Sequence, residues 1–390
     1  MYMLNIVIDI LGLLLFFIGV YYLAVAFFSL IPVAQTPKEV EKNRYAVVIP
    51  AHNEAGVIGE LIQSINDAEY PKGHISVFVV ADGCADRTAI IARNKGAEVL
   101  IKEKASDKGS ALKFALSNGK IKDGGFDCIA VFDADNIVSP RFFLEMDERI
   151  ANGAVAVQGY IDSKNPYSTW VSNAYSVWYW LTNRISQAGK AKLGIGARIG
   201  GTGFVLKTEL LDKIPWETNS VAEDMEYTCI LAENNIKVDY AEKAVVYDEK
   251  PESFNASVTQ RSRWARGVCD VQGEYSFKFL IRGRINALLG MWSDVLFPLV
   301  FVILILIKIT GAHGIWQTTA GTMVLWFYLT AIVLVSVIAL ITDKKLSYKT
   351  VLNTFGFIMY MLSWLPSGIL GVFCKKSDKW QHTLHKKKID

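Results

Sequence analysis

The apolar residues of this chain gather at its two ends, and a stretch of ordinary globular composition separates them. Apolar runs of about 20 residues are long enough to cross the hydrocarbon of a bilayer. The pattern predicts membrane-associated segments at 6–31, 288–309, 319–341 and 351–373. A cleaved signal peptide is the alternative for the first segment, but no basic region precedes it and no small-residue cleavage site follows it.

Lysine and arginine residues flank these segments, and their distribution predicts the sides of the membrane on which the loops lie. Basic residues follow the first segment, precede the second, follow the third and fill the tail, so the middle of the chain and the tail are expected in the cytoplasm. The fourth segment then has to bend or re-enter at Pro366-Ser367-Gly368. We expect a transmembrane helix over 1–33, an interfacial linker over 271–287, a transmembrane region over 288–374 and a basic tail over 375–390.

Between the apolar ends, runs of strand length alternate with helical patterns. The predicted strands cover 45–49, 75–80, 97–101, 128–132 and 154–157. Their apolar residues are continuous rather than alternating, which is typical of parallel strands covered on both faces. The pattern predicts an α/β domain of the doubly wound, Rossmann-like kind with a mostly parallel sheet, over residues 44–270.

Composition narrows the function classes. The chain has 390 residues, and 41 basic residues nearly balance 38 acidic ones, so the strongly basic field of a nucleic-acid binder is missing. The five cysteines show neither pairing nor metal-binding spacing, which indicates reduced thiols. We expect no nucleic acid among the partners.

Acidic residues follow three of the predicted strands: Glu54 after the first, Asp82 after the second, and Asp133 and Asp135 after the fourth. Ligands of open parallel sheets bind at the carboxyl ends of the strands, so these side chains are expected to line one mouth. An acidic mouth accepts an anionic ligand only through a cation, and Asp133 and Asp135 suit Mg²⁺ or Mn²⁺ carrying a diphosphate. The alternative, a simple Asp-x-Asp turn, does not account for Asp82.

Three helical motifs follow. Lys108 opens a helix and is placed to reach a phosphate, although a solvated lysine on a capped surface helix stays open as the alternative. Ser220-x-x-Glu223 matches a capping box, which explains Glu223 but not Asp224, a candidate general base.

Gln260, Arg263 and Trp264 share one face of a helix at i, i+3 and i+4. Arg263 would meet an anionic leaving group and Trp264 the apolar face of a sugar, whereas the alternative is a basic amphipathic helix on anionic lipid. The aromatic-rich segment 167–188 predicts an interfacial helix, with core packing as the alternative.

Taken in order, these motifs resemble those of membrane-embedded family 2 glycosyltransferases such as the hyaluronan, chitin, poly-N-acetylglucosamine and cellulose synthases. The motifs are Pro50-Ala51-His52-Asn53-Glu54, Asp82-Gly83, Asp133-Ala134-Asp135, Gly200-Gly201-Thr202-Gly203, Glu223-Asp224 and Gln260-Arg261-Ser262-Arg263-Trp264. The resemblance implies a GT-A fold and a nucleotide-diphosphate sugar donor, most often UDP-linked.

The resemblance also implies roles for single residues. Those on the donor side, contacting nucleoside, diphosphate or metal, are Ala51, Glu54, Asp82, Lys108, Asp133, Asp135 and Arg263. Those on the acceptor side are Gly201, Thr202, Gly203, Glu223, Gln260 and Trp264, with Asp224 as the catalytic base. Ala222 departs from the cellulose synthases, which usually have Thr before the matching Glu.

Three functions compete at this point. The first is an inverting, processive synthase of a β-linked polysaccharide, which would export its product alone, as a homo-oligomer or with an accessory subunit. The second is an enzyme that adds one or a few sugars to a membrane lipid acceptor. The third is a non-enzymatic membrane protein, which the acidic strand ends argue against. For either enzyme we expect a location at the cell membrane with the catalytic domain in the cytoplasm.

Overall fold

A single sheet of eight strands organises the central domain. The computed structural model describes residues 2–31, 40–292, 319–364 and 366–368. The strands are β1 (Tyr45–Ala51), β2 (Ile75–Asp82), β3 (Glu98–Lys102), β4 (Cys128–Val131), β5 (Ile137–Val138), β6 (Ala156–Ser163), β7 (Phe204–Lys207) and β8 (Asp239–Asp248). Five of them coincide with the predicted apolar runs, whereas β5, β7 and β8 were not predicted.

The strand order is β3-β2-β1-β4-β7-β6-β8-β5. Strands β1 to β4 pair in parallel, and so do β6 and β8, but β7 runs antiparallel between β4 and β6, and β5 runs antiparallel to β8. The expectation of a mostly parallel sheet is therefore corrected to a mixed one. The reason is that strands buried on both faces carry continuous apolar runs whichever way they point, so the pattern does not report direction.

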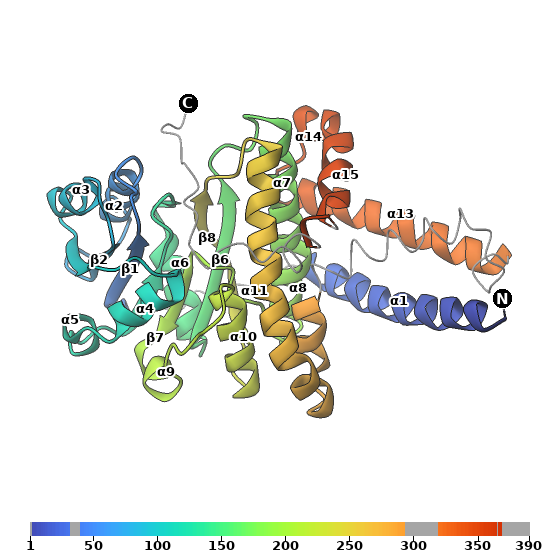
Figure 1. Cartoon of the computed structure of the whole chain (residues 1–390), viewed down its shortest axis with the longest axis horizontal. Coiled ribbons are helices and arrows are strands. Elements are labelled where there is room, and N and C mark those ends of the chain that lie inside the picture. Colours follow the sequence, from blue (N-terminus) through green and yellow to red (C-terminus); the bar gives the residue numbers. More distant parts are fainter. Residues whose placement is uncertain (1, 32–39, 293–318, 365, 369–390) are drawn as a thin grey trace.

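Helices cover both faces of the sheet (Figure 1). One core contains buried side chains of α2 (Ile58–Asn66), α3 (Thr88–Asn94) and α6 (Phe142–Ala151). The other contains side chains of α4 (Lys108–Leu116), α5 (Gly119–Lys122), α7 (Trp170–Leu181), α9 (Thr208–Lys213) and α10 (Glu223–Glu233). This two-sided cover explains why the strands β1 and β4 are apolar at nearly every position.

The aromatic segment forms α7, which continues through a π-helical stretch η1 (Thr182–Ala188) into α8 (Gly189–Lys192). Tyr175 and Trp180 of α7 are at most 2 % exposed, so packing accounts for these two rings, whereas Trp170 is 45 % exposed. The long helix α11 (Phe254–Ile281) and α15 (Thr354–Leu362), which follows α14 (Tyr348–Leu352), pack around α7 (Figure 1). An interfacial position for this helix stays a prediction.

Two helices project together from one side of the domain: α1 (Tyr2–Ser29) and α13 (Thr319–Thr342) (Figure 1). In the part of the chain that the structure describes, no helix has both the length and the apolar character that a bilayer crossing requires. The crossings expected over 6–31 and 319–341 are therefore not found. Most of the expected segment 288–309 and the basic tail 375–390 lie outside the described residues.

Candidate active site

A cavity of about 780 Å³ lies at the carboxyl ends of the parallel strands and extends beneath α7 and α11. Nearly all the residues singled out in the sequence line it: Ala51, Glu54, Asp82, Lys108, Asp133, Asp135, Gly201, Thr202, Glu223, Asp224, Gln260, Arg263 and Trp264. Gly203 is the exception. Segments more than 200 residues apart in the chain therefore meet in one place, as the sequence motifs predicted.

At one end of the cavity, Asp82 ends strand β2 and is 4 % exposed. Its carboxylate accepts hydrogen bonds from the Lys102 ammonium at 2.9 Å and from the backbone N–H and the hydroxyl of Ser106 at 2.9 and 3.0 Å. Asp82 thereby ties the loop that leads into α4 to the sheet. This loop and strand β1 shape the end of the cavity where Ala51 and Glu54 lie.

Carboxylates crowd at the exit of β4. Burial raises the pKa of Asp135 well above its usual range, and the nearby charges of Asp248, Asp133 and Glu54 raise it further. Burial, followed by the charge of Asp133, likewise raises the pKa of Glu54 to about 8. Glu54 and Asp135 therefore hold protons at neutral pH that a cation bound in this acidic cluster would displace.

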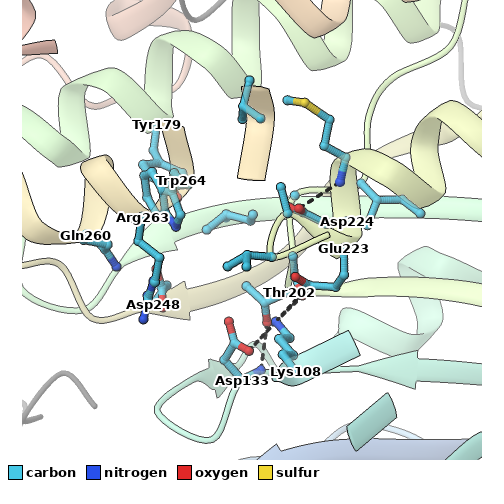
Figure 2. A pocket seen from close by; sticks show the side chains of 18 of the residues that line it. Lys108, Asp133, Tyr179, Thr202, Glu223, Asp224, Asp248, Gln260, Arg263 and Trp264 are labelled. Carbon is cyan, nitrogen blue, oxygen red and sulfur yellow. Dashed lines mark hydrogen bonds and ion pairs between the residues drawn. The ribbon is translucent and has the colours of Figure 1, made fainter. Parts of the chain in front are cut away.

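Lys108 connects three segments of the cavity wall. Its ammonium lies 2.5 Å from Asp133 Oδ1 and 3.8 Å from Glu223 Oε1, and it donates to the carbonyl oxygen of Gly201 at 2.7 Å (Figure 2). Burial alone would lower the pKa of Lys108, but the charges of Asp133 and Glu223 outweigh it and raise the pKa. Lys108 is thus an internal cation, and the capping of α4 by Asp107, which accepts from Ser110 N–H at 2.8 Å, holds it there.

Helix α10 begins at Glu223 with Ala222 in the cap position, and no side chain caps it. The predicted capping box between Ser220 and Glu223 is wrong, because it is Glu226, and not Glu223, that binds the backbone N–H of Ser220. Its carboxylate accepts from the N–H groups of Asn219 and Ser220 at 2.9 and 2.6 Å. Glu223 is thereby left to face the cavity.

Asp224 enters the cavity from the first turn of α10, on the same wall as Glu223 (Figure 2). Burial raises the pKa of Asp224, while the charges of Lys108 and Arg198 oppose this rise. Burial also raises the pKa of Glu223 to about 8. A carboxylate with a raised pKa is a better proton acceptor, so Asp224 suits the removal of a proton from a hydroxyl.

The glycine-rich loop has two different functions. Gly201 (φ +84°) borders Asp224, and a Cβ added there would lie 3.3 Å from Asp224 Oδ2. Thr202 holds the loop that follows β4 in place, because its Oγ1 accepts from Asp133 N–H at 3.0 Å. Gly203 (φ +63°) packs against Val246 in the sheet, outside the cavity, so its expected place in the acceptor floor is corrected.

Gln260, Arg263 and Trp264 lie on one face of α11, as the spacing predicted. Figure 2 shows them beside Tyr179 and Asp248, across the cavity from Glu223 and Asp224. The helix therefore brings a cation, an amide and an aromatic ring opposite the candidate base.

Asp248, Lys250 and Tyr179 are among the lining residues that the sequence did not assign to the site. Asp248 ends β8, and its carboxylate accepts from Lys250 at 2.7 Å and from Asn136 Nδ2 at 3.1 Å. Lys250 is 2 % exposed on its side chain, and its ammonium lies 3.3 Å from the ring centroid of Tyr179. The run Ala244-Val245-Val246-Tyr247 followed by Asp248 and Glu249 was the available signal, since it repeats the pattern of an apolar strand with an acidic end.

The acidic cluster suits a divalent cation, although within the described ranges no group of three His, Cys, Asp or Glu side chains can hold one by itself. Asp133 and Asp135 offer carboxylate oxygens, the ligands that Mg²⁺ and Mn²⁺ prefer. Burial and the charges of the neighbouring carboxylates raise the pKa of Asp135. A bound cation would relieve the repulsion among these carboxylates. A ligand with oxygens of its own, such as a diphosphate, would complete the coordination.

The family model for "glycosyltransferase like family 2" matches residues 43–267, more than half of the chain and the whole of the cavity-bearing domain. The chain belongs to this glycosyltransferase family. The match confirms the resemblance at the level of the family, since all the motifs that carried it lie inside the matched residues.

Curated relatives of this glycosyltransferase are identical to it at about a quarter of the aligned residues. A "probable glycosyltransferase YdaM" of Bacillus subtilis is 28% identical over 58% of this chain and 56% of its own length. An N-acetylglucosaminyltransferase of Mesorhizobium japonicum is 24% identical over 57% and 55% of the two chains. A beta-monoglucosyldiacylglycerol synthase of Trichormus variabilis is 24% identical over 66% and 56%. The matches thus span little more than half the length of these relatives.

A solved structure resembles the whole of the glycosyltransferase. The mannosyltransferase PcManGT of Pyrobaculum calidifontis, in complex with GDP-Man and Mn²⁺, aligns with a TM-score of 0.62 at 16% identity. The alignment covers 96% of this chain and 100% of the other. At this identity the similarity establishes a shared fold, which supports the expected GT-A architecture.

Proposed function

We propose that this protein transfers a sugar from a nucleotide-diphosphate donor, most readily a UDP-sugar, to a hydroxyl acceptor with inversion at the anomeric carbon. The observation that carries the proposal is the single cavity in which Asp82 and Asp135, from strand ends, face Asp224 and Arg263, from helices. The first pair suits a nucleotide and its diphosphate. The second pair supplies a base and a cation to opposite ends of the reacting bond.

Asp224 acts as the general base. It removes the proton of the acceptor hydroxyl as that oxygen attacks the anomeric carbon, and the bond from this carbon to the diphosphate oxygen breaks in the same step. Gly201 supports this role, because the absence of a side chain at this position leaves room beside the Asp224 carboxylate. The raised pKa of Asp224 strengthens it as a base, provided that the group is ionised when the acceptor arrives.

Negative charge develops on the departing diphosphate, and only groups aimed at it accelerate the step. Arg263 and Lys108 line the cavity and supply cations that would bind it. Asp133 and Asp135 would hold Mg²⁺ or Mn²⁺, which supplies charge stabilisation of the leaving group. Ala51, Glu54 and Asp82 would bind the nucleoside.

The acceptor has two candidates. A processive synthase would extend a β-linked polysaccharide and pass it through the membrane, alone or with an export subunit. A lipid glycosyltransferase would add one or a few sugars, as the name of the Trichormus variabilis relative suggests. A lipid acceptor has specific support, because apolar side chains line the cavity together with Asp224: Val221, Met225, Val268 and Trp292.

We further propose that the protein is held at the cell membrane with its catalytic domain in the cytoplasm. Large apolar side chains are exposed along the projecting helices, including Ile10, Phe17 and Phe27 of α1 and Trp326, Phe327 and Val333 of α13. Contiguous exposed apolar surface marks a membrane or protein contact. Membrane fractionation tests this, because a protein recovered in the soluble fraction without detergent would contradict it.

The test of the transfer reaction uses the purified full-length chain with a panel of UDP-sugars and GDP-mannose, with Mn²⁺ or Mg²⁺. Nucleotide release and product length are measured together. One sugar nucleotide should support release, and EDTA should abolish it. Long products identify a polymerase, and one or a few sugars on added diacylglycerol identify a lipid glycosyltransferase. Absence of release with every donor would contradict the proposal.

A further inference from the structure

The side chain of Tyr175 contacts the cavity indirectly, through Gln260. Tyr175 lies in the middle of α7 and is fully buried, and its hydroxyl donates to Gln260 Oε1 at 3.0 Å. The two residues are 85 positions apart. Tyr175 itself does not line the cavity, whereas Gln260 does.

This hydrogen bond fixes which end of the Gln260 amide faces the cavity. A side-chain amide has one acceptor oxygen and an NH₂ group with two donors. Because Oε1 is turned toward the buried Tyr175 hydroxyl, the NH₂ group is the end turned away from Tyr175 and available to a ligand. In Figure 2 the nitrogen of Gln260 lies on the side of Arg263 and Asp248. Gln260 is thereby presented as a donor to a ligand oxygen.

The ring of Tyr175 is held from several sides. Its centroid lies 4.9 Å from that of Tyr360 on α15 and 6.2 Å from that of Trp264 on α11. Arg261, fully buried, places its guanidinium carbon 4.6 Å over the Tyr360 ring and donates to the Tyr360 carbonyl oxygen at 3.2 Å. The hydroxyl of Tyr175 therefore has little freedom to leave Gln260.

Protonation keeps the hydroxyl a donor. Burial raises the pKa of Tyr175 above its ordinary value, so the phenol carries its proton at neutral pH. A buried phenol needs an acceptor, and Gln260 Oε1 at 3.0 Å is nearer than the second acceptor, the Ser257 carbonyl oxygen at 3.4 Å.

We propose that Tyr175 is a positioning residue, which orients the Gln260 amide so that its NH₂ group donates to an oxygen of the reacting sugars. The inference rests on the proposed glycosyl transfer and adds a residue that none of the motifs contains. It also assigns a function to the aromatic helix α7: it holds the cavity-facing side of α11 in a defined orientation.

The test compares Tyr175→Phe, Gln260→Ala and the double variant of the full-length protein. Turnover is measured as UDP release from the UDP-sugar that the wild-type protein uses, and UDP affinity is measured by calorimetry. Losing one hydrogen bond predicts about a tenfold fall in turnover for Tyr175→Phe, with UDP affinity and melting temperature nearly unchanged. In the Gln260→Ala background, Tyr175→Phe should have no further effect, since Tyr175 acts through Gln260.

Tyr360→Phe is the matched control. It also removes a buried hydroxyl from the same cluster, but among the described residues no hydrogen bond joins that hydroxyl to Gln260, so turnover should not change. Equal losses in Tyr175→Phe and Tyr360→Phe, additive effects in the double variant, or wild-type turnover in Tyr175→Phe would overturn the inference. Inactive wild-type protein would instead count against the proposed function.

Discussion

The two halves of the cavity are built by different means. The donor half uses Glu54, Asp82 and Asp133, which lie at or just beyond the ends of neighbouring parallel strands. The acceptor half uses Asp224 and Gln260, which reach the cavity from helices that meet only through tertiary packing; the second of these helices, α11, also carries Arg263 on the side of the departing diphosphate. Backbone pairing thus positions one half, and contacts between aromatic and apolar side chains position the other.

The difference extends to the energetics. Burial and then carboxylate repulsion dominate the donor half, where the pKa of Glu54 rises to about 8 and that of Asp135 also rises. Packing dominates the acceptor half, where Tyr175 and Arg261 are fully buried. We therefore expect substitutions of the donor half to change ligand affinity and pH dependence, and substitutions of the acceptor half to change turnover.

The largest effect is expected for Asp224→Asn. The amide cannot accept the proton of the acceptor hydroxyl, so turnover should fall by about 10²-fold or more. UDP release from the preferred UDP-sugar measures it, with Asp270→Asn on the far part of α11 as a control that retains activity. Wild-type turnover in Asp224→Asn would show that another group is the base.

Arg263→Gln should follow. The neutral side chain cannot stabilise the charge that develops on the diphosphate, so turnover should fall by about 10²-fold. Arg282→Gln is the control: its guanidinium pairs with Glu233 at 2.8 Å at the end of the same helix, outside the cavity. Equal activity of the two variants would remove Arg263 from the mechanism.

A smaller effect is expected for Lys108→Met. Losing the ammonium leaves Asp133 and Glu223 without their shared cation, so the KM for the donor should rise about tenfold. Lys113→Met, at an exposed position of the same helix, should leave the KM unchanged. An unchanged KM in Lys108→Met would mean that the lysine has only a structural function.

The smallest effect concerns stability. The folded protein binds the Glu54 proton more tightly than the unfolded chain, because the pKa rises from 4.5 to about 8. The stability that the folded protein gains by binding this proton is complete below pH 4.5 and is lost as the pH rises towards 8. Glu54→Gln removes this loss, so without ligand it should melt a few degrees above the wild type near pH 8 and alongside it near pH 5. The exposed Glu69→Gln should show no such trend.

The donor half could be predicted from the sequence because its signals are local. An apolar run followed by an acidic residue is contiguous, and Glu54, Asp82 and Asp133 follow strands that the structure confirms. The prediction failed for β8, where Glu242 and Lys243 interrupt the apolar pattern, and Asp248 was missed with it. Strand β7 offers only three successive apolar residues before Lys207, so it was not recognised, and the mixed character of the sheet was missed as well.

The acceptor half was only partly predictable. The i, i+3, i+4 spacing placed Gln260, Arg263 and Trp264 on one helix face, but nothing local links Tyr175 to Gln260. The same applies to Glu226, which binds the backbone N–H of Ser220 where a capping box with Glu223 was predicted. Such contacts depend on how helices pack, and a single sequence carries little record of that packing.

The most direct test of the two-halves account is calorimetric measurement of UDP binding, with Mn²⁺ present, to the wild type and to Asp82→Asn, Asp135→Asn and Asp224→Asn. The account predicts that the first two variants bind UDP at least about tenfold more weakly, while Asp224→Asn stays within about twofold of the wild type. Weak binding by Asp224→Asn, or undisturbed binding by Asp82→Asn and Asp135→Asn, would contradict it.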